Sequence, residues 1–256
     1  MMNVSLDYVT GISRDAGNIL RDGVDDVHTL DYKGPTNIVT EVDKKAEAFI
    51  VGKIRKYFPD HTIIAEEGGQ IQGDRGKFWF IDPIDGTSNY SRGLPLFAVS
   101  IGYQENGQMK FGCVYDPMRD ECFSAERGKG AWLNEKPIHV SKTEKLINAM
   151  LVTGFPYDIY QENNNLDHFS DLIKEVRAVH RLGSAALNQV YVASGRLDGY
   201  WEIGVDSWDI AAGTLIVEEA GGIVSALDGS EDYMKPPYAI LASNEILHKT
   251  LQAFLI

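Results

Sequence analysis

Apolar residues near the N-terminus recur at intervals of three or four positions. The series Val4, Tyr8, Ile12, Ala16, Ile19 and Leu20 predicts an amphipathic helix over about residues 3–30. After the turn-forming residues 33–37, a second helical segment is predicted from Thr40 to Tyr57 and Phe58, before Pro59. Thr40 followed three residues later by Asp43 is typical of helix capping, so capping is one interpretation of both residues.

Short apolar runs follow, and they predict β-strands rather than helices. They cover residues 62–65, 78–81, 96–103, 109–115 and 121–125. Asn106-Gly107 separates two of these runs, which strongly indicates a β-hairpin. The first half of the chain is therefore predicted to place two helices on a mostly antiparallel sheet.

From residue 149 onward the pattern alternates between strands and helices, as in α/β proteins. Strands are predicted at 150–153, 223–225 and 238–242, and helices at 166–178, from Gly183-Ser184-Ala185 to about Gly195, from Asp206 or Ser207 to Ala220, and at 244–254. The turn-rich segment 128–137 is the best boundary. We expect an N-terminal half (1–140) and a C-terminal half (141–256), packed as one functional unit.

Composition narrows the function classes. The 256 residues include 37 acidic and 24 basic side chains, giving a net charge of −13, which argues against binding of a nucleic acid polymer. No apolar run approaches the roughly 18 residues of a membrane span, and no signal-peptide pattern opens the chain. We expect a cytoplasmic protein without membrane contact, with Cys113 and Cys122 as reduced core residues.

The most informative stretch follows the strand at 78–81. The strand ends at Asp82, and Pro83 favours an extended Asp82, so that Asp82 and Asp85 can face one point with the Ile84 carbonyl as a third oxygen donor. Hard cations such as Mg²⁺ bind oxygens of this kind. Gly86 permits close approach of a ligand, and Thr87 begins a helix whose N–H groups suit phosphate. The alternative is an ordinary Asx-type turn.

Two further acidic groups fit the same chemistry. Glu66 and Glu67 follow the strand at 62–65, and because side chains alternate along a strand, one of them should point inward as another metal donor. Asp209 falls in the first turn of the helix that begins near Asp206. A carboxylate in the first turn is also stabilised by the helix dipole. We prefer this structural role for Asp206, but we interpret Asp209 as a metal ligand.

Taken together, these motifs resemble the inositol monophosphatase family, within the lithium-sensitive, magnesium-dependent phosphatase superfamily. The resemblance covers nearly the whole chain and rests on Asp82-Pro83-Ile84-Asp85-Gly86-Thr87, Trp208-Asp209-Ile210-Ala211-Ala212-Gly213, Glu66-Glu67 and the segment from Lys33 to Asp43. It implies a layered αβαβα sandwich, with an antiparallel-sheet N-terminal half and an α/β C-terminal half. It also implies a homodimer whose active site lies between the two halves of each chain.

The resemblance assigns roles to single residues. One metal site is implied at Glu66, Asp82 and the Ile84 carbonyl, and a second at Asp82, Asp85 and Asp209, so that two or three Mg²⁺ neutralise the phosphate ester and activate water. Thr87, paired with Asp43, would orient that water alongside Glu66, and the N–H groups of Gly86 and Thr87 would bind phosphate. Sugar-ring contacts are implied at Gly183, Ser184, Ala185 and Glu202.

We expect a Mg²⁺-dependent phosphomonoesterase acting on inositol monophosphate or a related small sugar or polyol phosphate. Asp206 departs from the neutral or titratable residue of animal relatives and leaves the substrate open. A relative acting on fructose 1,6-bisphosphate, a 3′-phosphonucleotide or the 2′-phosphate of NADP is the alternative, with Arg177, His180 and Arg181 as candidates for a second phosphate. A non-catalytic, acidic cation-binding protein is the third hypothesis.

Overall fold

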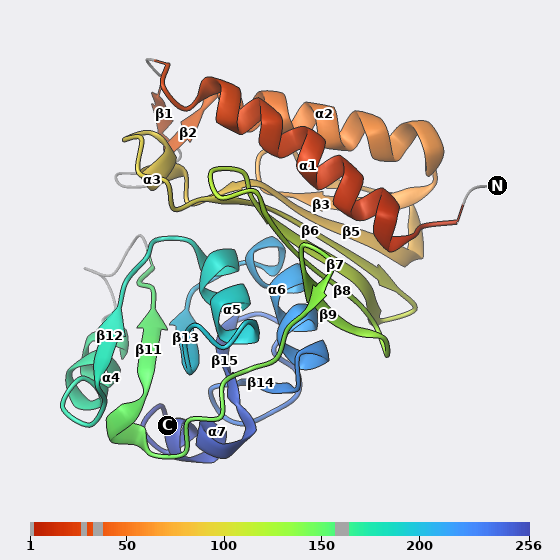
Figure 1. Ribbon diagram of the computed structural model, residues 1–256. Coiled ribbons are helices and arrows are strands. Elements are labelled where there is room, and N and C mark those ends of the chain that lie inside the picture. Colours follow the sequence, from red (N-terminus) through yellow and green to blue (C-terminus); the bar gives the residue numbers. More distant parts are fainter. Residues whose placement is uncertain (1–2, 27–29, 33–37, 157–163) are drawn as a thin grey trace.

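The computed structural model describes residues 3–26, 30–32, 38–156 and 164–256, and its elements form five layers (Figure 1). Helices α1 (Leu6–Gly23) and α2 (Glu41–Tyr57) cover one face of a large sheet. Helices α5 (Ala185–Ala193) and α6 (Ser207–Glu219) separate that sheet from a smaller one, and α4 (Asn164–Leu172) and α7 (Glu245–Gln252) cover its outer face. The predicted αβαβα sandwich is confirmed.

The large sheet has eight strands among the described residues, in the order β10-β9-β8-β7-β6-β5-β3-β4. Only the β3–β5 pair is parallel within it, so the mostly antiparallel prediction holds. The strands are β3 (His61–Ala65), β4 (Gly69–Ile71), β5 (Asp74–Asp85), β6 (Ala98–Glu105), β7 (Gln108–Asp116), β8 (Glu121–Glu126), β9 (Gly130–Leu133) and β10 (Lys136–Pro137). Asn106 and Gly107 both have positive φ, as the predicted two-residue hairpin requires.

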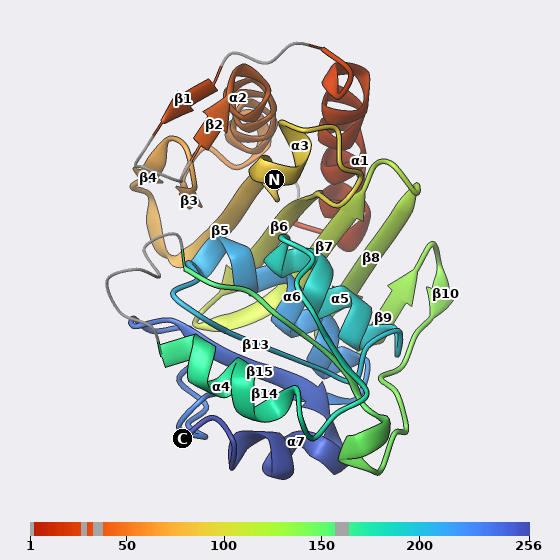
Figure 2. The same cartoon turned by 90° about the vertical axis from the view of Figure 1, so that its left-hand side faces the viewer.

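The smaller sheet runs β12-β11-β13-β15-β14 and is mixed. Its strands are β11 (Met150–Thr153), β12 (Ala178–His180), β13 (Gly199–Ile203), β14 (Gly222–Ala226) and β15 (Ala239–Asn244). β11 pairs in parallel with β12 and β13, whereas β15 is antiparallel to both of its neighbours. A two-stranded ribbon, β1 (Leu30–Tyr32) and β2 (Ile38–Thr40), lies beside α2 (Figure 2).

Two predicted helices were too long. α1 ends at Gly23, a poor helix former, and the apolar series stops after the C-cap residue Val24, where acidic Asp25 and Asp26 follow. α4 ends at Leu172 rather than near Ala178, because residues 178–180 pair with β11 and tertiary pairing overrides local helix propensity. The predicted breaker cluster 33–37 lies outside the described residues.

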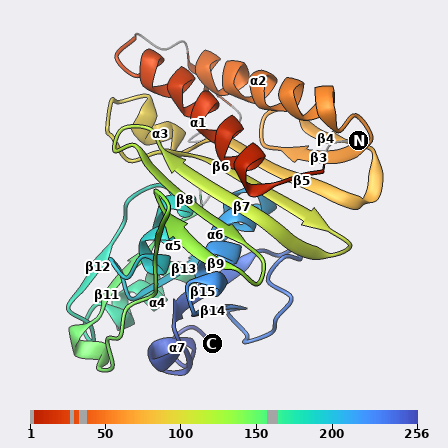
Figure 3. The same ribbon diagram turned by 45° about the vertical axis from the view of Figure 1, so that its right-hand side comes forward.

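Helix α6 lies close against the large sheet, as Figure 3 shows from the side. A Cβ atom on Gly112 would come within 2.7 Å of the Ala212 carbonyl oxygen, and one on Gly102 within 3.1 Å of the Ala211 Cβ. Glycine at both positions therefore permits the contact, which brings the start of α6 beside the end of β5. In the part of the chain that the structure describes, no helix is long and apolar enough to cross a bilayer.

Candidate active site

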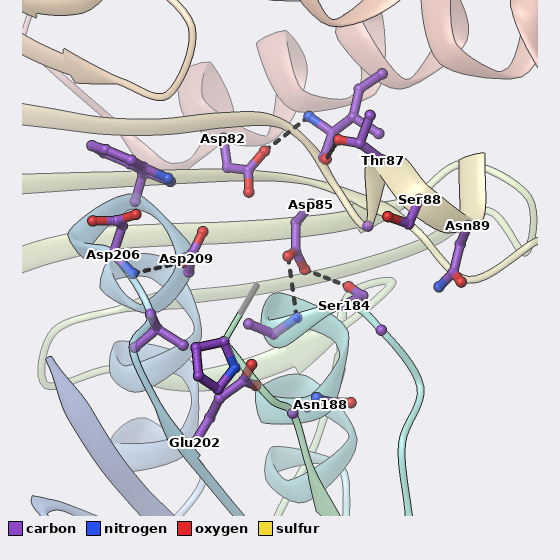
Figure 4. Close-up of a pocket in the computed structure, with 18 of the residues that line it drawn as sticks. Asp82, Asp85, Thr87, Ser88, Asn89, Ser184, Asn188, Glu202, Asp206 and Asp209 are labelled. Carbon is purple, nitrogen blue, oxygen red and sulfur yellow. Dashed lines mark hydrogen bonds between the residues drawn. The ribbon is translucent and has the colours of Figure 1, made fainter. Parts of the chain in front are cut away.

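A pocket of about 180 Å³ opens between the end of β5 in the large sheet and the N-terminal ends of α5 and α6 (Figure 4). Its walls come from the end of β5, the short helix α3 (Thr87–Tyr90), the N-terminal turns of α5 and α6, and β13. The sequence-predicted residues that line it are Glu66, Asp82, Ile84, Asp85, Gly86, Thr87, Gly183, Ser184, Ala185, Glu202 and Asp209. Asp43 does not line the pocket, but its carboxylate accepts a hydrogen bond from the hydroxyl of Thr87, which does.

The first two carboxylates are placed by an irregularity at the end of β5. Asp82 pairs with Ser100 and Asp85 with Ala98, so three steps along β5 match two along β6 and the strand bulges. The Asp82 carboxylate accepts a hydrogen bond from the Ile84 N–H at 3.0 Å. Gly86 then turns the chain with φ of 102°, a conformation that favours glycine. The bulge and the turn together direct both carboxylates toward the pocket.

Asp209 reaches the same point from α6. One oxygen from each of Asp82, Asp85 and Asp209 lies within 4.8 Å of the other two. The Asp206 N–H donates to the Asp209 carboxylate at 2.7 Å, which holds that side chain at the helix start, while Asp206 itself is the N-cap residue. Residues more than a hundred positions apart in the sequence thus form one cluster of carboxylates.

Glu66 completes this acidic wall from a neighbouring strand. β3 and β5 run parallel, with Ala65 opposite Ile81. The next residues along the two segments, Glu66 and Asp82, therefore lie side by side near the ends of the two strands. The Glu66 N–H donates to the Ile81 carbonyl at 3.2 Å. Its carboxylate lines the pocket without belonging to the group of three within 4.8 Å.

Burial and mutual repulsion shift the pKa values of these acids upward. Burial raises the pKa of Asp82 well above its usual range, and the charges of Glu66, Asp85 and Asp209 raise it further. Burial likewise raises the pKa of Asp209, aided by Asp85. The pKa of Asp85 rises to about 6 through burial, although hydrogen bonds from Ser184, Ala186 and Ala185 oppose the shift.

Such a cluster fits a divalent cation. Buried like-charged carboxylates are costly unless a positive charge neutralises them, and every donor is a hard oxygen of the kind Mg²⁺ prefers. The Ile84 carbonyl oxygen is also at the site, where it accepts a hydrogen bond from the Thr87 hydroxyl at 2.9 Å.

Asp43 serves as a helix cap and as the partner of Thr87. One carboxylate oxygen accepts the Thr40 N–H at 2.8 Å and the Thr40 hydroxyl at 2.5 Å, which closes a capping box at the start of α2. The other oxygen accepts the Thr87 hydroxyl at 3.0 Å. Burial raises the pKa of Asp43. The two interpretations of this residue are therefore compatible.

The start of α5 is directed at Asp85. The Ser184 hydroxyl and the N–H groups of Ala185 (3.1 Å) and Ala186 (2.7 Å) all donate to the Asp85 carboxylate. Ser184 and Ala185 therefore fix the Asp85 carboxylate, and this structural role is additional to the substrate contact predicted for them. Gly183 has φ of 81°, and a side chain there would meet Asn89.

Glu202 lies on the opposite wall, at the β13 side of the pocket (Figure 4). Its carboxylate accepts the Tyr200 hydroxyl at 2.8 Å, and burial raises its pKa to about 7. A Cβ atom on Gly154 would overlap this carboxylate, so glycine is needed beside it.

Several lining residues were missed from the sequence. Asn188 is 1% exposed, and its carbonyl oxygen has no hydrogen-bond partner among the residues that the structure describes. It lies four positions after Ser184, one turn along α5, and that spacing could have identified it. Phe155 also lines the pocket. Of the three basic candidates Arg177, His180 and Arg181, only Arg181 lines it.

The layered fold and the acidic pocket define the structural class as that of the inositol monophosphatases. The structure of inositol monophosphatase from Anabaena (Nostoc) superposes with a TM-score of 0.89 at 42% identity, covering 98% of this chain and 94% of that one. The extragenic suppressor protein suhB from Bartonella henselae superposes with a TM-score of 0.93 at 36% identity, covering 97% of each chain.

Sequence comparison gives the same result. The chain belongs to the inositol monophosphatase family, whose sequence model matches residues 4–256. An inositol-1-monophosphatase from Mesorhizobium japonicum is 38% identical over 98% of this chain and 92% of its own length. The protein named Nus factor SuhB from Pasteurella multocida is 42% identical over 98% of this chain and 95% of its own length.

Proposed function

We propose that this protein is a Mg²⁺-dependent phosphomonoesterase that hydrolyses inositol monophosphate or a related small polyol phosphate. The observation that carries the proposal is the convergence of Asp82, Asp85 and Asp209 within 4.8 Å, in a pocket also lined by Glu66. Family membership supports the same reaction class.

We assign the acidic wall to metal binding. Glu66, Asp82 and the Ile84 carbonyl would hold one Mg²⁺, and Asp82, Asp85 and Asp209 a second, with Asp82 shared. When bound, the cations would neutralise the phosphate and make water a stronger nucleophile. Asp43 and the Ile84 carbonyl hold the Thr87 hydroxyl from two sides, which fixes it in the pocket wall where it can orient that water beside Glu66.

The alcohol part of the ester is assigned to the opposite wall. Glu202 can accept hydrogen bonds from hydroxyl groups, and it lines the pocket on the side opposite Asp82, which suits a role in recognition. The N–H groups of Gly86 and Thr87 are assigned to the phosphate, and Gly183, Ser184 and Ala185 to the ring. We also propose that residues 1–140 bind metal and phosphate, that residues 141–256 bind the substrate and supply Asp209, and that the protein is a homodimer.

A bisphosphate substrate is less well supported. Arg181 is the basic residue that lines the pocket in the described part of the chain, and its guanidinium lies 5.9 Å from the centre of the Phe155 ring. It is therefore positioned for a contact with an aromatic ring rather than displayed as a free phosphate clamp. One such cation is a weak basis for a second phosphate site.

A second candidate comes from the relatives named Nus factor SuhB. That name describes a protein factor rather than an enzyme, so a binding role could accompany catalysis or replace it. The buried carboxylate cluster supports a bound cation, because buried acids are costly to keep without one, and family membership supports its use in catalysis.

The test is phosphate release from a panel of esters, measured with Mg²⁺ and with excess chelator. The panel includes inositol monophosphate, fructose 1,6-bisphosphate, a 3′-phosphonucleotide, NADP and an aryl phosphate. We expect Mg²⁺-dependent hydrolysis, highest for inositol monophosphate among the natural esters. Absence of Mg²⁺-dependent release from every ester would contradict the proposal and favour the binding role.

A further inference from the structure

The buried face of α2 carries two carboxylates one helical turn apart. Asp43 and Glu47 are four residues apart and therefore point the same way. Asp43 holds Thr87, whereas the Glu47 carboxylate accepts the Glu67 N–H at 2.8 Å. Glu47 is 7% exposed and does not line the pocket. Its role must therefore be exerted through the chain that it contacts.

That chain is the tight connection that carries Glu66. Ala65 pairs with Gly69 across the β3–β4 hairpin, so residues 66–68 form its loop. The Glu66 N–H is tied to the Ile81 carbonyl on one side, and the Glu67 N–H is tied to Glu47 on the other. A Cβ atom on Gly68 would lie 2.8 Å from the other Glu47 carboxylate oxygen, so the loop lies directly against this side chain.

We propose that Glu47 is a positioning residue that fixes the 66–68 loop and thereby the Glu66 carboxylate at the pocket. The effect of Glu47 on catalysis, unlike its contact with the loop, rests on the proposed function. Asp82, Asp85 and Asp209 are placed by a strand bulge and a helix start, but Glu66 sits in a three-residue loop. A hydrogen bond from an N–H to a buried carboxylate is stronger than one to a neutral acceptor, which suits an anchor for that loop.

One helix therefore sets two parts of the pocket. The turn at Asp43 holds the hydroxyl of Thr87, and the next turn holds the loop of Glu66, with both contacts on one face of α2. A shift of α2 along the sheet would displace both groups together.

The experiment compares Glu47→Gln, Glu47→Leu and a matched control, Asp198→Asn. Asp198 is also a buried carboxylate, 7% exposed, and accepts the Met150 N–H at 2.7 Å, but it lies at the smaller sheet away from the pocket. Amide hydrogen exchange over residues 66–69 and Mg²⁺ binding by calorimetry are measured on each full-length variant.

We expect Glu47→Leu to raise exchange over residues 66–69 and to weaken Mg²⁺ binding by about tenfold, the size typical for groups that orient metal ligands. Glu47→Gln keeps an acceptor oxygen and should fall between wild type and Glu47→Leu. Asp198→Asn should lower the melting temperature without changing either readout. Gly68→Ala, which would push against Glu47, provides a second disturbance of the same contact if Glu47→Leu does not fold.

Unchanged exchange over residues 66–69 in folded Glu47 variants would overturn the assignment, as would the same change in Asp198→Asn. Increased exchange with unaltered Mg²⁺ affinity would overturn the link to Glu66 as a metal ligand. If wild type bound no Mg²⁺, the proposed function would fail, while the exchange measurement would still decide whether Glu47 holds the loop.

Discussion

The two walls of the pocket are built in different ways. On the side of the large sheet, Asp82 and Asp85 accept hydrogen bonds from nearby backbone N–H groups, and Asp43 fixes Thr87. On the side of the smaller sheet, Glu202 has one hydroxyl partner, and the Asn188 carbonyl oxygen has none among the described residues. The first wall is rigidly held, and the second has groups with unused hydrogen-bonding capacity.

Under the proposed assignment, this contrast would let one fold keep its chemistry while its substrate changes. Groups that hold metal and orient water must keep a fixed geometry, because small displacements are costly in rate. Under the proposed assignment, the second wall binds the alcohol part, and its groups can be exchanged with little effect on the first wall. Variants that alter one wall but change the function assigned to the other would contradict this division between the walls.

The largest effect is expected for Asp82→Asn. Asp82 is 2% exposed and faces the oxygens of both Asp85 and Asp209, so its charge is assigned to both metal positions. Turnover of every substrate should fall on the order of a thousandfold, which corresponds to about 4 kcal/mol. The fold should persist, because one of several repelling charges is removed. Near-normal kcat at saturating Mg²⁺ would contradict the assignment.

Thr87→Ala should have the next largest effect. The variant loses the hydroxyl between Asp43 and the Ile84 carbonyl, and we expect a loss of about a hundredfold for polyol and aryl phosphates alike. Steady-state kinetics on both substrates provide the measurement. Thr87→Ser, which keeps the hydroxyl, is the control and should retain most of the activity. A loss confined to the polyol phosphate would place Thr87 on the recognition side.

Glu202→Gln should affect only one class of substrate. If the carboxylate meets the hydroxyls of the alcohol part, kcat/KM for the polyol phosphate should fall about 10- to 100-fold, while an aryl phosphate changes little. Equal, large losses on both substrates would mean that Glu202 supports the metal wall. No change on either substrate would mean that it contacts no substrate.

The smallest effect concerns the pH dependence of stability without metal. In the folded, metal-free protein the pKa of Asp85 is about 6 and that of Glu202 about 7, both above their usual values. The folded state then binds more protons than the unfolded state, so this stabilisation is present at pH 4 and is lost as pH rises through 6 to 7. With chelator, these groups should lower the melting temperature by a few degrees between pH 5 and pH 8.

Two comparisons test this explanation. Mg²⁺ binds the deprotonated acids, so the gain in melting temperature on adding Mg²⁺ should be larger at pH 8 than at pH 5. Glu202→Gln should flatten the dependence seen in chelator. An identical slope in wild type and Glu202→Gln would show that the buried glutamate does not contribute.

The site residues on the side of the large sheet could be predicted from the sequence better than those on the side of the smaller sheet, for a physical reason. Asp82, Ile84, Asp85 and Thr87 are close together along the chain, so local turn chemistry indicates that they converge. The hairpin at Asn106-Gly107 and the strand at β11 were predicted for the same reason, because their signals are local.

Contacts between distant elements could not be derived in this way. The roles of Glu202 and of the Asp43–Thr87 pair came from family resemblance, and Glu47 and Asn188 were not identified at all. Glu47 acts through a loop twenty residues later in the sequence, and only the fold shows that α2 lies against it. The predicted end of α4 was wrong because residues 178–180 pair with β11 as strand β12 instead of continuing the helix.

Anomalous diffraction from crystals grown with Mn²⁺ in place of Mg²⁺ would locate the proposed metal sites directly. We expect a strong anomalous peak between Asp82, Asp85 and Asp209, and a second beside Glu66 and the Ile84 carbonyl. Because Asp82 is assigned to both metal positions, both peaks should be weakened or lost in Asp82→Asn crystals. Mn²⁺ bound elsewhere, with no peak at the carboxylate cluster, would contradict the assignment of this wall to metal-dependent phosphate hydrolysis.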